Sequence, residues 1–327
     1  MPLGQAPPMK TVSLARHAMA TRFEIVLHGE DESGLRAAGE EALDEISALA
    51  AQLNFHSADS DLSRINAGAA LGPVPVEPGL FRLLQEAKRI HEQSGGAFDV
   101  TVAPLMRCWG LWDGERRVPT PGELAKAHDF VGMGLIHLDE ESFTVQFERP
   151  EVQIDLGAIG KGYALEEADR LLREAGVSSA LLHGGTSSVC AIGTPPNEPH
   201  WRIAIKHPNP NTSEPAGPEQ LVAVPGLRDE SLGVSCGLGR AFEHRGELYG
   251  HVLDPRCGRP TQNAVLAAVV LPSGTAADAW STALLVSAEA GPDALRQAEG
   301  NGRSLLMLPG DDKSYRLAGA GFEMVNC

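Results

Sequence analysis

Ala277-Asp-Ala-Trp-Ser-Thr-Ala283 lies within residues 275–290, a stretch of small and apolar residues that follows Pro272-Ser-Gly274. This composition after a Pro-Ser-Gly break predicts a helix with Asp278 near its first turn. Residues four apart share a helix face, so Asp278 and Thr282 are expected to point the same way. A carboxylate and a hydroxyl are hard oxygen ligands that suit Mg²⁺, although a capping aspartate and a core threonine would give the same pattern.

The overall composition limits the classes of partner. The 327 residues, 43% hydrophobic and 21% charged, suffice for about two ordinary domains or one large one with a substantial core. The 43 acidic and 27 basic residues give a net charge of −16. This charge disfavours binding to nucleic acid or to an anionic membrane. A phosphate site therefore needs a cation, a lysine or backbone amides beside it.

Cysteine usage and the first residues bear on location. The five cysteines form no Cys-x-x-Cys pair, which is typical of reduced thiols rather than of a disulfide framework or a zinc site. The first ten residues lack the basic start and apolar run of a secretory signal, and no run approaches the length that spans a bilayer. We therefore expect a cytoplasmic protein.

Strands and helices are predicted to alternate along the chain. Apolar residues with helical spacing predict three further helices, the first with Ser33 as its N-cap, and short alternating or apolar runs predict strands. A polar loop is expected at residues 55–66. The expected helices are 33–53, 79–93 and 161–175, and the expected strands are 21–28, 143–147, 152–156, 180–182, 201–206, 222–224 and 265–271.

The domain organisation follows from what interrupts these elements. Residues 207–220 contain four prolines and two asparagines, which predicts a surface insertion. No repeat or linker divides the chain, so we expect one α+β unit with mixed or antiparallel sheets and packed helices in two intertwined halves. Residues 1–18 are assigned to an N-terminal extension and residues 19–327 to a single domain.

Gly157-Ala-Ile-Gly-Lys-Gly162 joins a predicted strand to a predicted helix. Glycines at such a junction let the backbone approach a ligand closely, and the helix N-terminus and Lys161 favour an anion. The spacing matches neither a P-loop nor Gly-x-Gly-x-x-Gly. A purely structural turn remains the alternative.

Two further segments carry groups suited to catalysis or binding. His251 lies three residues before Asp254, which suits a general base with its orienting partner or a substrate ligand, although Asp-Pro-x-x-Gly also forms turns. Phe98 and Asp99 follow a helix stop and look exposed. They could line a pocket for a planar ring, or Phe98 could simply fill the core.

Six short segments between residues 19 and 283 carry a combined signal. They are Met19-Ala-Thr-Arg-Phe23, Asp59-Ser-Asp-Leu-Ser-Arg-Ile-Asn66, Ser94-Gly-Gly-Ala-Phe-Asp-Val-Thr-Val-Ala-Pro-Leu105, Ile154-Asp-Leu-Gly-Ala-Ile-Gly-Lys-Gly-Tyr-Ala164, His251-Val-Leu-Asp-Pro-Arg-Cys-Gly258 and Ala277-Asp-Ala-Trp-Ser-Thr-Ala283. In this order they resemble the ApbE family, the Mg²⁺-dependent FAD:protein FMN transferases. The resemblance implies an ApbE-like fold with a cofactor cleft between its two halves.

The resemblance also implies roles for individual residues. Asp278, Thr282 and the backbone carbonyl of Ala158 correspond to the ligands of the metal. His251 corresponds to the histidine that looks catalytic in the family, and Asp254 lies beside it. The residues expected to contact FAD are Met19, His56, Ala97, Phe98, Asp99, Asp155, Lys161 and the backbone near Val252.

The implied reaction is cleavage of the FAD diphosphate with Mg²⁺ as cofactor. A Ser or Thr hydroxyl of an acceptor flavoprotein attacks the flavin-side phosphorus, and AMP departs. FAD and this acceptor are the expected partners, without nucleic acid or membrane. Departures from the family pattern at His56, Thr186, Cys236 and Cys257 leave open a non-catalytic FAD-binding or flavin-buffering protein, or an FAD pyrophosphatase that forms FMN and AMP.

Overall fold

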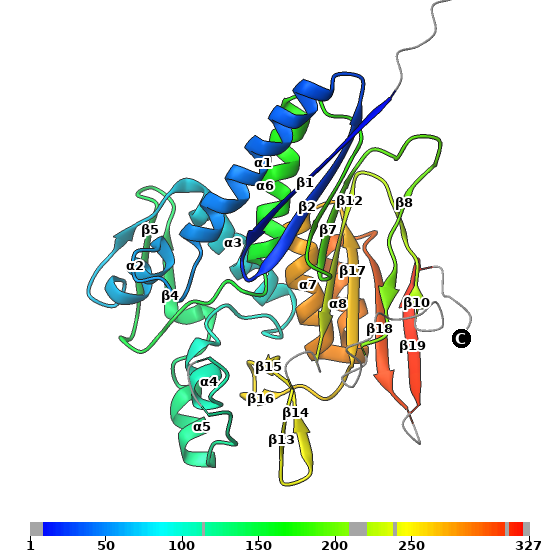
Figure 1. Cartoon of the computed structure of the whole chain (residues 1–327). Coiled ribbons are helices and arrows are strands. Elements are labelled where there is room, and N and C mark those ends of the chain that lie inside the picture. The colour runs from blue at the N-terminus through cyan, green and yellow to red at the C-terminus, as the bar shows by residue number, and fades with distance from the viewer. Residues whose placement is uncertain (1–8, 113–114, 209–220, 238–240, 311–313, 323–327) are drawn as a thin grey trace, which may run out of the picture.

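One eight-stranded sheet forms the body of the molecule (Figure 1). The computed structural model describes residues 9–112, 115–208, 221–237, 241–310 and 314–322. Every neighbouring pair of strands in the sheet is antiparallel. In spatial order the strands are β1 (Lys10–Ala18), β2 (Thr21–Gly29), β6 (Ala180–Gly184), β7 (Ser188–Ile192), β12 (Glu230–Cys236), β17 (Leu266–Leu271), β18 (Arg303–Pro309) and β19 (Tyr315–Ala320).

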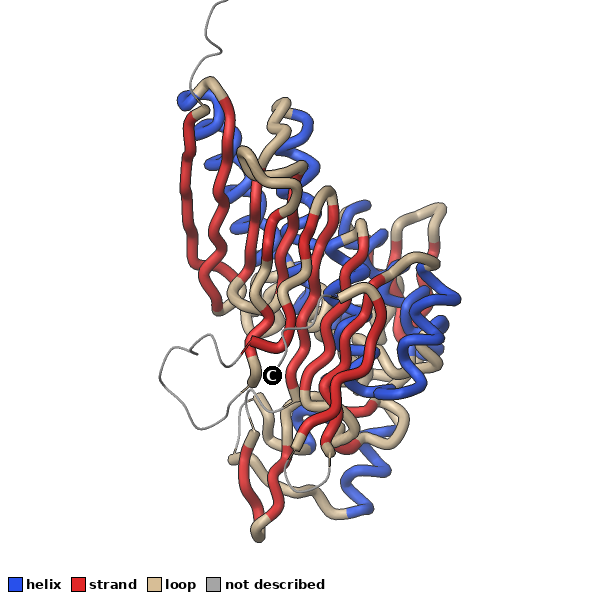
Figure 2. The backbone as a smooth tube through the Cα atoms, turned by 90° about the vertical axis from the view of Figure 1, so that its right-hand side faces the viewer, coloured by secondary structure: helices blue, strands red, loops and turns tan. Residues whose placement is uncertain are grey.

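Three long helices cover one face of this sheet: α1 (Glu32–Gln52), α6 (Gly160–Glu174) and α7 (Gly274–Ser287). Figure 2 shows the strands in front and the helices behind them. The main hydrophobic core lies between these layers and includes Phe23, Ile25 and Trp280, all fully buried. Since nearly every residue of α7 is buried, this helix is fixed by packing on nearly all sides.

Short strands cover the opposite face of the sheet. β8 (Trp201–Arg202) pairs with β11 (Gly226–Leu227), and β9 (Ile205–Lys206) pairs with β10 (Leu221–Ala223). Their apolar side chains form a second core with the outward-facing residues of β7, β12, β17 and β18. The sheet is therefore buried on both faces over its centre.

The remaining elements form the second half of the molecule, beside one end of the sheet (Figure 1). The helices are α2 (Asp61–Gly68), α3 (Pro78–Gln93), α4 (Ala103–Cys108) and α5 (Pro121–His128), with η1 (Met133–Leu135). A three-stranded sheet contains β3 (Val74–Pro75), β4 (Ile136–Asp139) and β5 (Thr144–Phe147), and two hairpins pair β13 (Phe242–His244) with β14 (Glu247–Tyr249) and β15 (Leu253–Asp254) with β16 (Arg259–Pro260). In the first half, η3 (Ala288–Ala290) and α8 (Gly291–Glu299) follow α7.

Most predicted elements are confirmed, with shifted ends. Helices α1, α3, α6 and α7 and strands β2, β5, β6, β10 and β17 occupy the expected places, and the α+β class is confirmed. The N-cap of α1 is Asp31 rather than Ser33, because the Asp31 carboxylate accepts the Ser33 N–H at 3.1 Å. Residues 209–220, most of the predicted Pro-rich insertion, lie outside the described residues.

The predicted N-terminal extension, residues 1–18, includes a strand of the main sheet. Residues 10–18 form β1 and pair with β2 along their whole length. Arg16 occupies an inward-facing position of β1 and interrupts its apolar alternation, so the strand pattern is weak in the sequence. Its guanidinium is bound by Glu40, at 3.0 Å, and by Asp44 of α1.

Residues 152–156, predicted as a strand, form no strand. Val152, Ile154 and Leu156 are buried in alternation, but the backbone between them has no neighbouring strand. Instead, Asn66 donates to the Ile154 carbonyl at 2.9 Å and accepts the Ile154 N–H at 2.8 Å. A side chain therefore replaces the partner strand, which the apolar pattern cannot reveal.

Two other predictions need correction. The polar loop at 55–66 contains the start of α2, which Ser60 caps by accepting the Ser63 N–H at 3.0 Å. The single strand predicted at 201–206 is divided into β8 and β9.

No helix among the described residues is long and apolar enough to cross a membrane, and the predicted cytoplasmic location stays a prediction.

Candidate active site

A cleft of about 1360 Å³ opens where the second half of the molecule meets the end of the sheet. Segments that are distant in the sequence meet there, among them the β1–β2 turn, the loop after α3, the start of α6, the end of β12 and one face of α7. All the predicted site residues except Asp254 line it. They are Met19, His56, Ala97, Phe98, Asp99, Asp155, Ala158, Lys161, His251, Val252, Asp278 and Thr282.

Asp254 lies outside this lining. Its carboxylate accepts hydrogen bonds from the backbone and the guanidinium of Arg256, at 2.7 to 3.0 Å. Gly258 N donates to the Asp254 carbonyl at 2.7 Å. The residue therefore stabilises the turn between β15 and β16, as the Asp-Pro-x-x-Gly pattern also allows.

Asp278 lies where the first turns of α6 and α7 meet, and is 4% exposed. One carboxylate oxygen accepts the Gly162 N–H at 2.9 Å, and the other accepts the Ser188 hydroxyl at 3.1 Å. A Cβ at Gly162 would lie 2.1 Å from the Gly274 carbonyl oxygen and 2.6 Å from the Asp278 Cβ. Glycine at this position therefore allows the two helices to approach, and the approach fixes the carboxylate.

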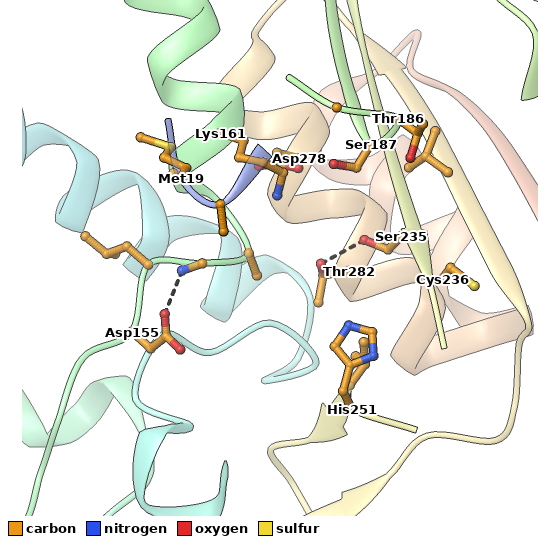
Figure 3. A pocket seen from close by; sticks show the side chains of 18 of the residues that line it. Met19, Asp155, Lys161, Thr186, Ser187, Ser235, Cys236, His251, Asp278 and Thr282 are labelled. Atoms are coloured by element: carbon orange, nitrogen blue, oxygen red, sulfur yellow. Dashed lines mark hydrogen bonds between the residues drawn. The ribbon is translucent and has the colours of Figure 1, made fainter. Parts of the chain in front are cut away.

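Thr282 lies one turn further along α7, on the same face (Figure 3). Its Oγ1 is 3.0 Å from Ser235 Oγ at the end of β12, and Ser235 Oγ is 2.7 Å from Ser281 Oγ. Ser281 donates to the Asp278 carbonyl at 2.7 Å. Three hydroxyl groups thus connect the strand to the helix at the cleft wall.

The donor set at this corner suits a hard cation. Asp278 offers a carboxylate and Thr282 a hydroxyl on one face of α7, and Ala158 lines the same cleft. Carboxylate, hydroxyl and carbonyl oxygens are the donors that Mg²⁺ prefers. Among the described residues no three His, Cys, Asp or Glu side chains gather as a complete metal site. Mg²⁺ commonly keeps such an incomplete protein shell and completes it with water and substrate phosphates.

Asp155 lies just before the Gly157–Gly162 turn, and Lys161 lies within it. Asp155 accepts the Gly157 N–H at 2.7 Å (Figure 3), and its own N–H donates to the Val100 carbonyl at 2.7 Å. Burial raises the pKa of the Asp155 carboxyl above its ordinary value, although the Gly157 N–H and the charge of Lys161 oppose the rise. Lys161, in the first turn of α6, places a positive charge at the N-terminus of the helix.

Phe98 and Asp99 are buried rather than exposed as the sequence suggests, with 1% and 6% of their surfaces accessible. Asp99 accepts the N–H and the hydroxyl of Thr101 at 2.7 and 2.5 Å, and its second oxygen lies 3.1 Å from Nδ1 of His91. Desolvation lowers the pKa of His91, but the hydrogen bond and charge of Asp99 outweigh it, so that the pKa is raised. The pair gives this wall a fixed shape.

Met19 and His56 reach the cleft by different local structures. Met19 and Ala20 form the two-residue turn between β1 and β2, with positive φ values of 47° and 57°. Such backbone strain in non-glycine residues is often found at functional sites. His56 is exposed beside Phe55 and Trp112, whose ring centroids lie 4.1 Å apart. These two cleft-lining rings were not predicted, because no periodic pattern marks them.

His251 enters the cleft from an arm formed by β13–β16. Figure 3 shows its imidazole directed toward Thr282, with Cys236 nearby. The arm is attached through a small cluster of Leu105, Trp109 and Leu253, and the indole of Trp109 donates to the Gly258 carbonyl at 2.8 Å. A histidine at this place can accept a proton from a nucleophile that approaches Asp278 and Thr282.

Several polar residues at the site were not predicted. Ser188 and the Gly162 N–H hold Asp278, Ser235 holds Thr282, and Ser281 contacts Ser235. In the sequence, Ser188 belongs to the Ser-rich segment after β6, and Ser235 belongs to the Ser-Cys-Gly end of β12. Nothing in the sequence shows that these segments contact α7. Of the positions that depart from the family pattern, His56, Thr186 and Cys236 line the cleft and Cys257 does not.

Comparisons with known proteins agree with this geometry. The ApbE family profile matches residues 19–305. The FAD:protein FMN transferase of Haemophilus influenzae is 29% identical over 316 residues, 94% of this chain and 88% of the relative. The FAD:protein FMN transferase of Rhodobacter capsulatus is 31% identical over 293 residues, 86% of this chain and 52% of the relative.

Solved structures confirm the predicted ApbE-like fold. The ApbE protein of Thermotoga maritima superposes with a TM-score of 0.82 at 25% identity, over 94% of this chain and 96% of that one. The flavin transferase ApbE of Vibrio cholerae gives a TM-score of 0.79 at 25% identity, over 95% and 97%. Since the family profile spans most of the sequence and the fold agrees along nearly the whole chain, this protein belongs to the ApbE family.

Proposed function

We propose that this protein transfers the FMN moiety of FAD to a Ser or Thr hydroxyl of an acceptor protein and releases AMP. The observation that carries the proposal is the meeting, in one cleft, of the Asp278–Thr282 face of α7, the N-terminus of α6 with Lys161, and His251. The relatives named FAD:protein FMN transferase, at 27–31% identity, support the same activity.

Asp278, Thr282 and the Ala158 carbonyl are the residues that would hold Mg²⁺. When bound there, Mg²⁺ neutralises negative charge on a diphosphate and orients it. Lys161 and the positive end of the α6 dipole add positive potential at the same place, which a protein of net charge −16 must supply locally. A diphosphate is therefore expected to bind between the start of α6 and the Asp278–Thr282 face of α7.

His251 faces this corner and is assigned the role of general base. It takes the proton from the acceptor hydroxyl as the oxygen forms a bond to the flavin-side phosphorus. The bond from that phosphorus to the bridging oxygen breaks, and the bridging oxygen leaves with AMP. Asp254 is not assigned a chemical step, because its carboxylate is bound to Arg256.

Two groups of cleft residues are suited to a planar ring. We assign neither group specifically to the flavin or to the adenine of FAD. Phe98, Ala97 and Met19 line one part of the cleft, and the Phe55–Trp112 pair with His56 lines another. Both contain apolar surface suited to a planar ring system. Asp155 also lines the cleft, close enough to Lys161 for their charges to interact.

The test is to incubate the protein with FAD, Mg²⁺ and candidate acceptor proteins, and to measure acceptor flavin fluorescence and AMP together. Equal amounts of labelled acceptor and AMP are expected. AMP formed equally well without acceptor would identify an FAD pyrophosphatase. Intact FAD held for hours in Mg²⁺ would identify a flavin-binding protein, and either result would overturn the proposal.

Cys257→Ser serves as a matched control for this assay. Cys257 departs from the family pattern, but it is exposed and does not line the cleft. The variant is expected to transfer FMN at the wild-type rate. Cys236 also departs from the family pattern but lines the cleft, so Cys236→Ser is expected to change the rate of FMN transfer.

A further inference from the structure

The hydroxyl groups of Thr282, Ser235 and Ser281 form a chain whose direction can be worked out by counting hydrogens. Each hydroxyl has one hydrogen to donate and two lone pairs that accept. Ser281 Oγ lies 2.7 Å from the Asp278 carbonyl oxygen, which can only accept. The hydrogen of Ser281 is therefore committed to that carbonyl.

The next link follows from the first. Ser235 Oγ lies 2.7 Å from Ser281 Oγ, and this short contact needs a hydrogen between the two oxygens. Since Ser281 has already used its own, Ser235 must donate. The remaining contact, 3.0 Å between Ser235 Oγ and Thr282 Oγ1, must then contain the hydrogen of Thr282.

The direction of the chain determines what Thr282 offers to the cleft. With its hydrogen turned toward β12, the hydroxyl presents only lone pairs to the cleft, as a cation ligand must. If Ser235 donated to Thr282 instead, the Thr282 hydrogen would be free to point at the cation. Ser281 is fully buried and does not line the cleft, so it can act on a ligand only through Ser235.

We propose that Ser235 and Ser281 are positioning residues that hold the Thr282 hydroxyl as an oriented oxygen ligand for a divalent cation. The inference rests on the proposed function, because it takes the cation of the transferase to bind at the Asp278–Thr282 face. It adds a role for the end of β12 and for a buried serine of α7. Hydrogen-bond partners of this kind orient metal ligands, and their loss typically weakens metal binding about 10- to 100-fold.

The test measures Mn²⁺ binding to the full-length protein by electron paramagnetic resonance, with Mn²⁺ as the probe for Mg²⁺. Ser235→Ala is expected to weaken Mn²⁺ binding about 10-fold or more. Ser281→Ala should weaken it as well, because the Ser235 hydrogen can then turn toward Thr282. The double variant should be no weaker than Ser235→Ala alone, since both changes act through one chain.

Two matched variants complete the set. Ser235→Thr keeps a hydroxyl at the position. Its Mn²⁺ affinity should stay within about threefold of the wild type, whereas Ser235→Ala should lose about 10-fold or more. Ser231→Ala removes a hydroxyl from the same strand and the same face, close to Gly274 at the start of α7 but outside the chain. It should bind Mn²⁺ like the wild type.

A purely structural role for the chain predicts a different result. In that case Ser235→Ala lowers the melting temperature while Mn²⁺ affinity stays unchanged, and the inference is overturned. Additive losses in the double variant also overturn it. If the wild type and Asp278→Asn bind Mn²⁺ equally weakly, the metal site at the Asp278–Thr282 face is itself wrong and the proposed function fails with it. In the transfer assay, the Mg²⁺ concentration for half-maximal rate should rise in Ser235→Ala while the rate at saturating Mg²⁺ changes less.

Discussion

The two walls of the cleft differ in how firmly they are held. Asp278 and Thr282 project from α7, a helix buried on nearly all sides, and their oxygens are bound by groups from α6, β7 and β12. His251 projects from the β13–β16 arm, which consists of two short hairpins over a small apolar cluster. The proposed metal ligands thus lie where packing fixes their spacing, and the proposed base lies where the packing is looser.

This difference suits the proposed chemistry. Ligands of a cation must keep their spacing to a few tenths of an ångström, which only close packing provides. A base that serves an entering protein hydroxyl must tolerate the arrival of that protein. We therefore expect substitutions of the Asp278–Thr282 face to stop the reaction, and substitutions in the β13–β16 arm to slow it.

The largest effect is expected from Asp278→Asn. The amide can still accept the Gly162 N–H with its oxygen and donate to Ser188 with its nitrogen, so the fold should remain. The loss of the charge should reduce Mg²⁺-dependent transfer below detection. The assay is AMP release at increasing Mg²⁺, with melting temperature as the check on folding.

The control for this variant is Asp254→Asn, on the β13–β16 arm. Asp254 lies outside the cleft lining and binds Arg256. The variant should keep the wild-type dependence on Mg²⁺. A shift in metal dependence equal to that of Asp278→Asn would mean that the two walls share the cation, and the comparison would break down.

His251→Ala is expected to have the next largest effect. Removing a general base typically slows the chemical step about 10²- to 10⁴-fold. FAD affinity, measured by flavin fluorescence, should change little, because the pocket for FAD is formed largely by other segments. Added imidazole should restore part of the rate.

His244→Ala provides the matched control, because His244 lies on the same arm but not in the lining of the cleft. It should transfer at nearly the wild-type rate. If both histidine variants are equally slow, the arm matters as a structural unit and His251 is not the base.

The sequence predicted the buried wall better than the arm. The helical spacing of Asp278 and Thr282, and the glycines before Lys161, follow from local rules that α6 and α7 obey. Six short segments in order then brought in the remaining cleft residues through a family resemblance. Local signals sufficed where a regular element carries the group.

The parts that the sequence missed depend on pairing between distant segments. Asn66 replaces a partner strand for Ile154, and Ser188 and Ser235 reach α7 from separate strands. The role assigned to Asp254 was not supported because a neighbouring arginine binds its carboxylate, a choice that spacing alone does not reveal. Such contacts depend on tertiary packing, so no periodic pattern in the sequence predicts them.

Gly162→Ala is expected to damage the buried wall through packing. The added methyl group would lie 2.1 Å from the Gly274 carbonyl oxygen, and α6 and α7 must then separate. Overpacking of this kind costs about 1–3 kcal/mol, measurable as a lower free energy of unfolding in urea. Gly160→Ala is the control on the same helix, since its methyl group would meet only Leu53 at 3.5 Å and should cost nothing.

The smallest expected effect concerns the pH dependence of stability. The pKa of His91 is raised above its ordinary value, so the protonated form is favoured by folding. Its stabilising contribution is complete below about pH 6.5 and is lost as the pH rises through the raised pKa. The melting temperature of wild type minus that of His91→Gln should therefore shrink between pH 6 and pH 9.

The control for pH is His137→Gln. His137 Nε2 lies 3.0 Å from Glu148 Oε1, but both side chains are largely exposed, and such contacts contribute little. Its difference from the wild type should stay small at every pH. A His91→Gln difference that grows with pH would mean that His91 is held neutral by the fold. The part of the cleft wall at Phe98 and Asp99 would then keep its shape through the backbone around Asp99 and Thr101, without help from a charge pair.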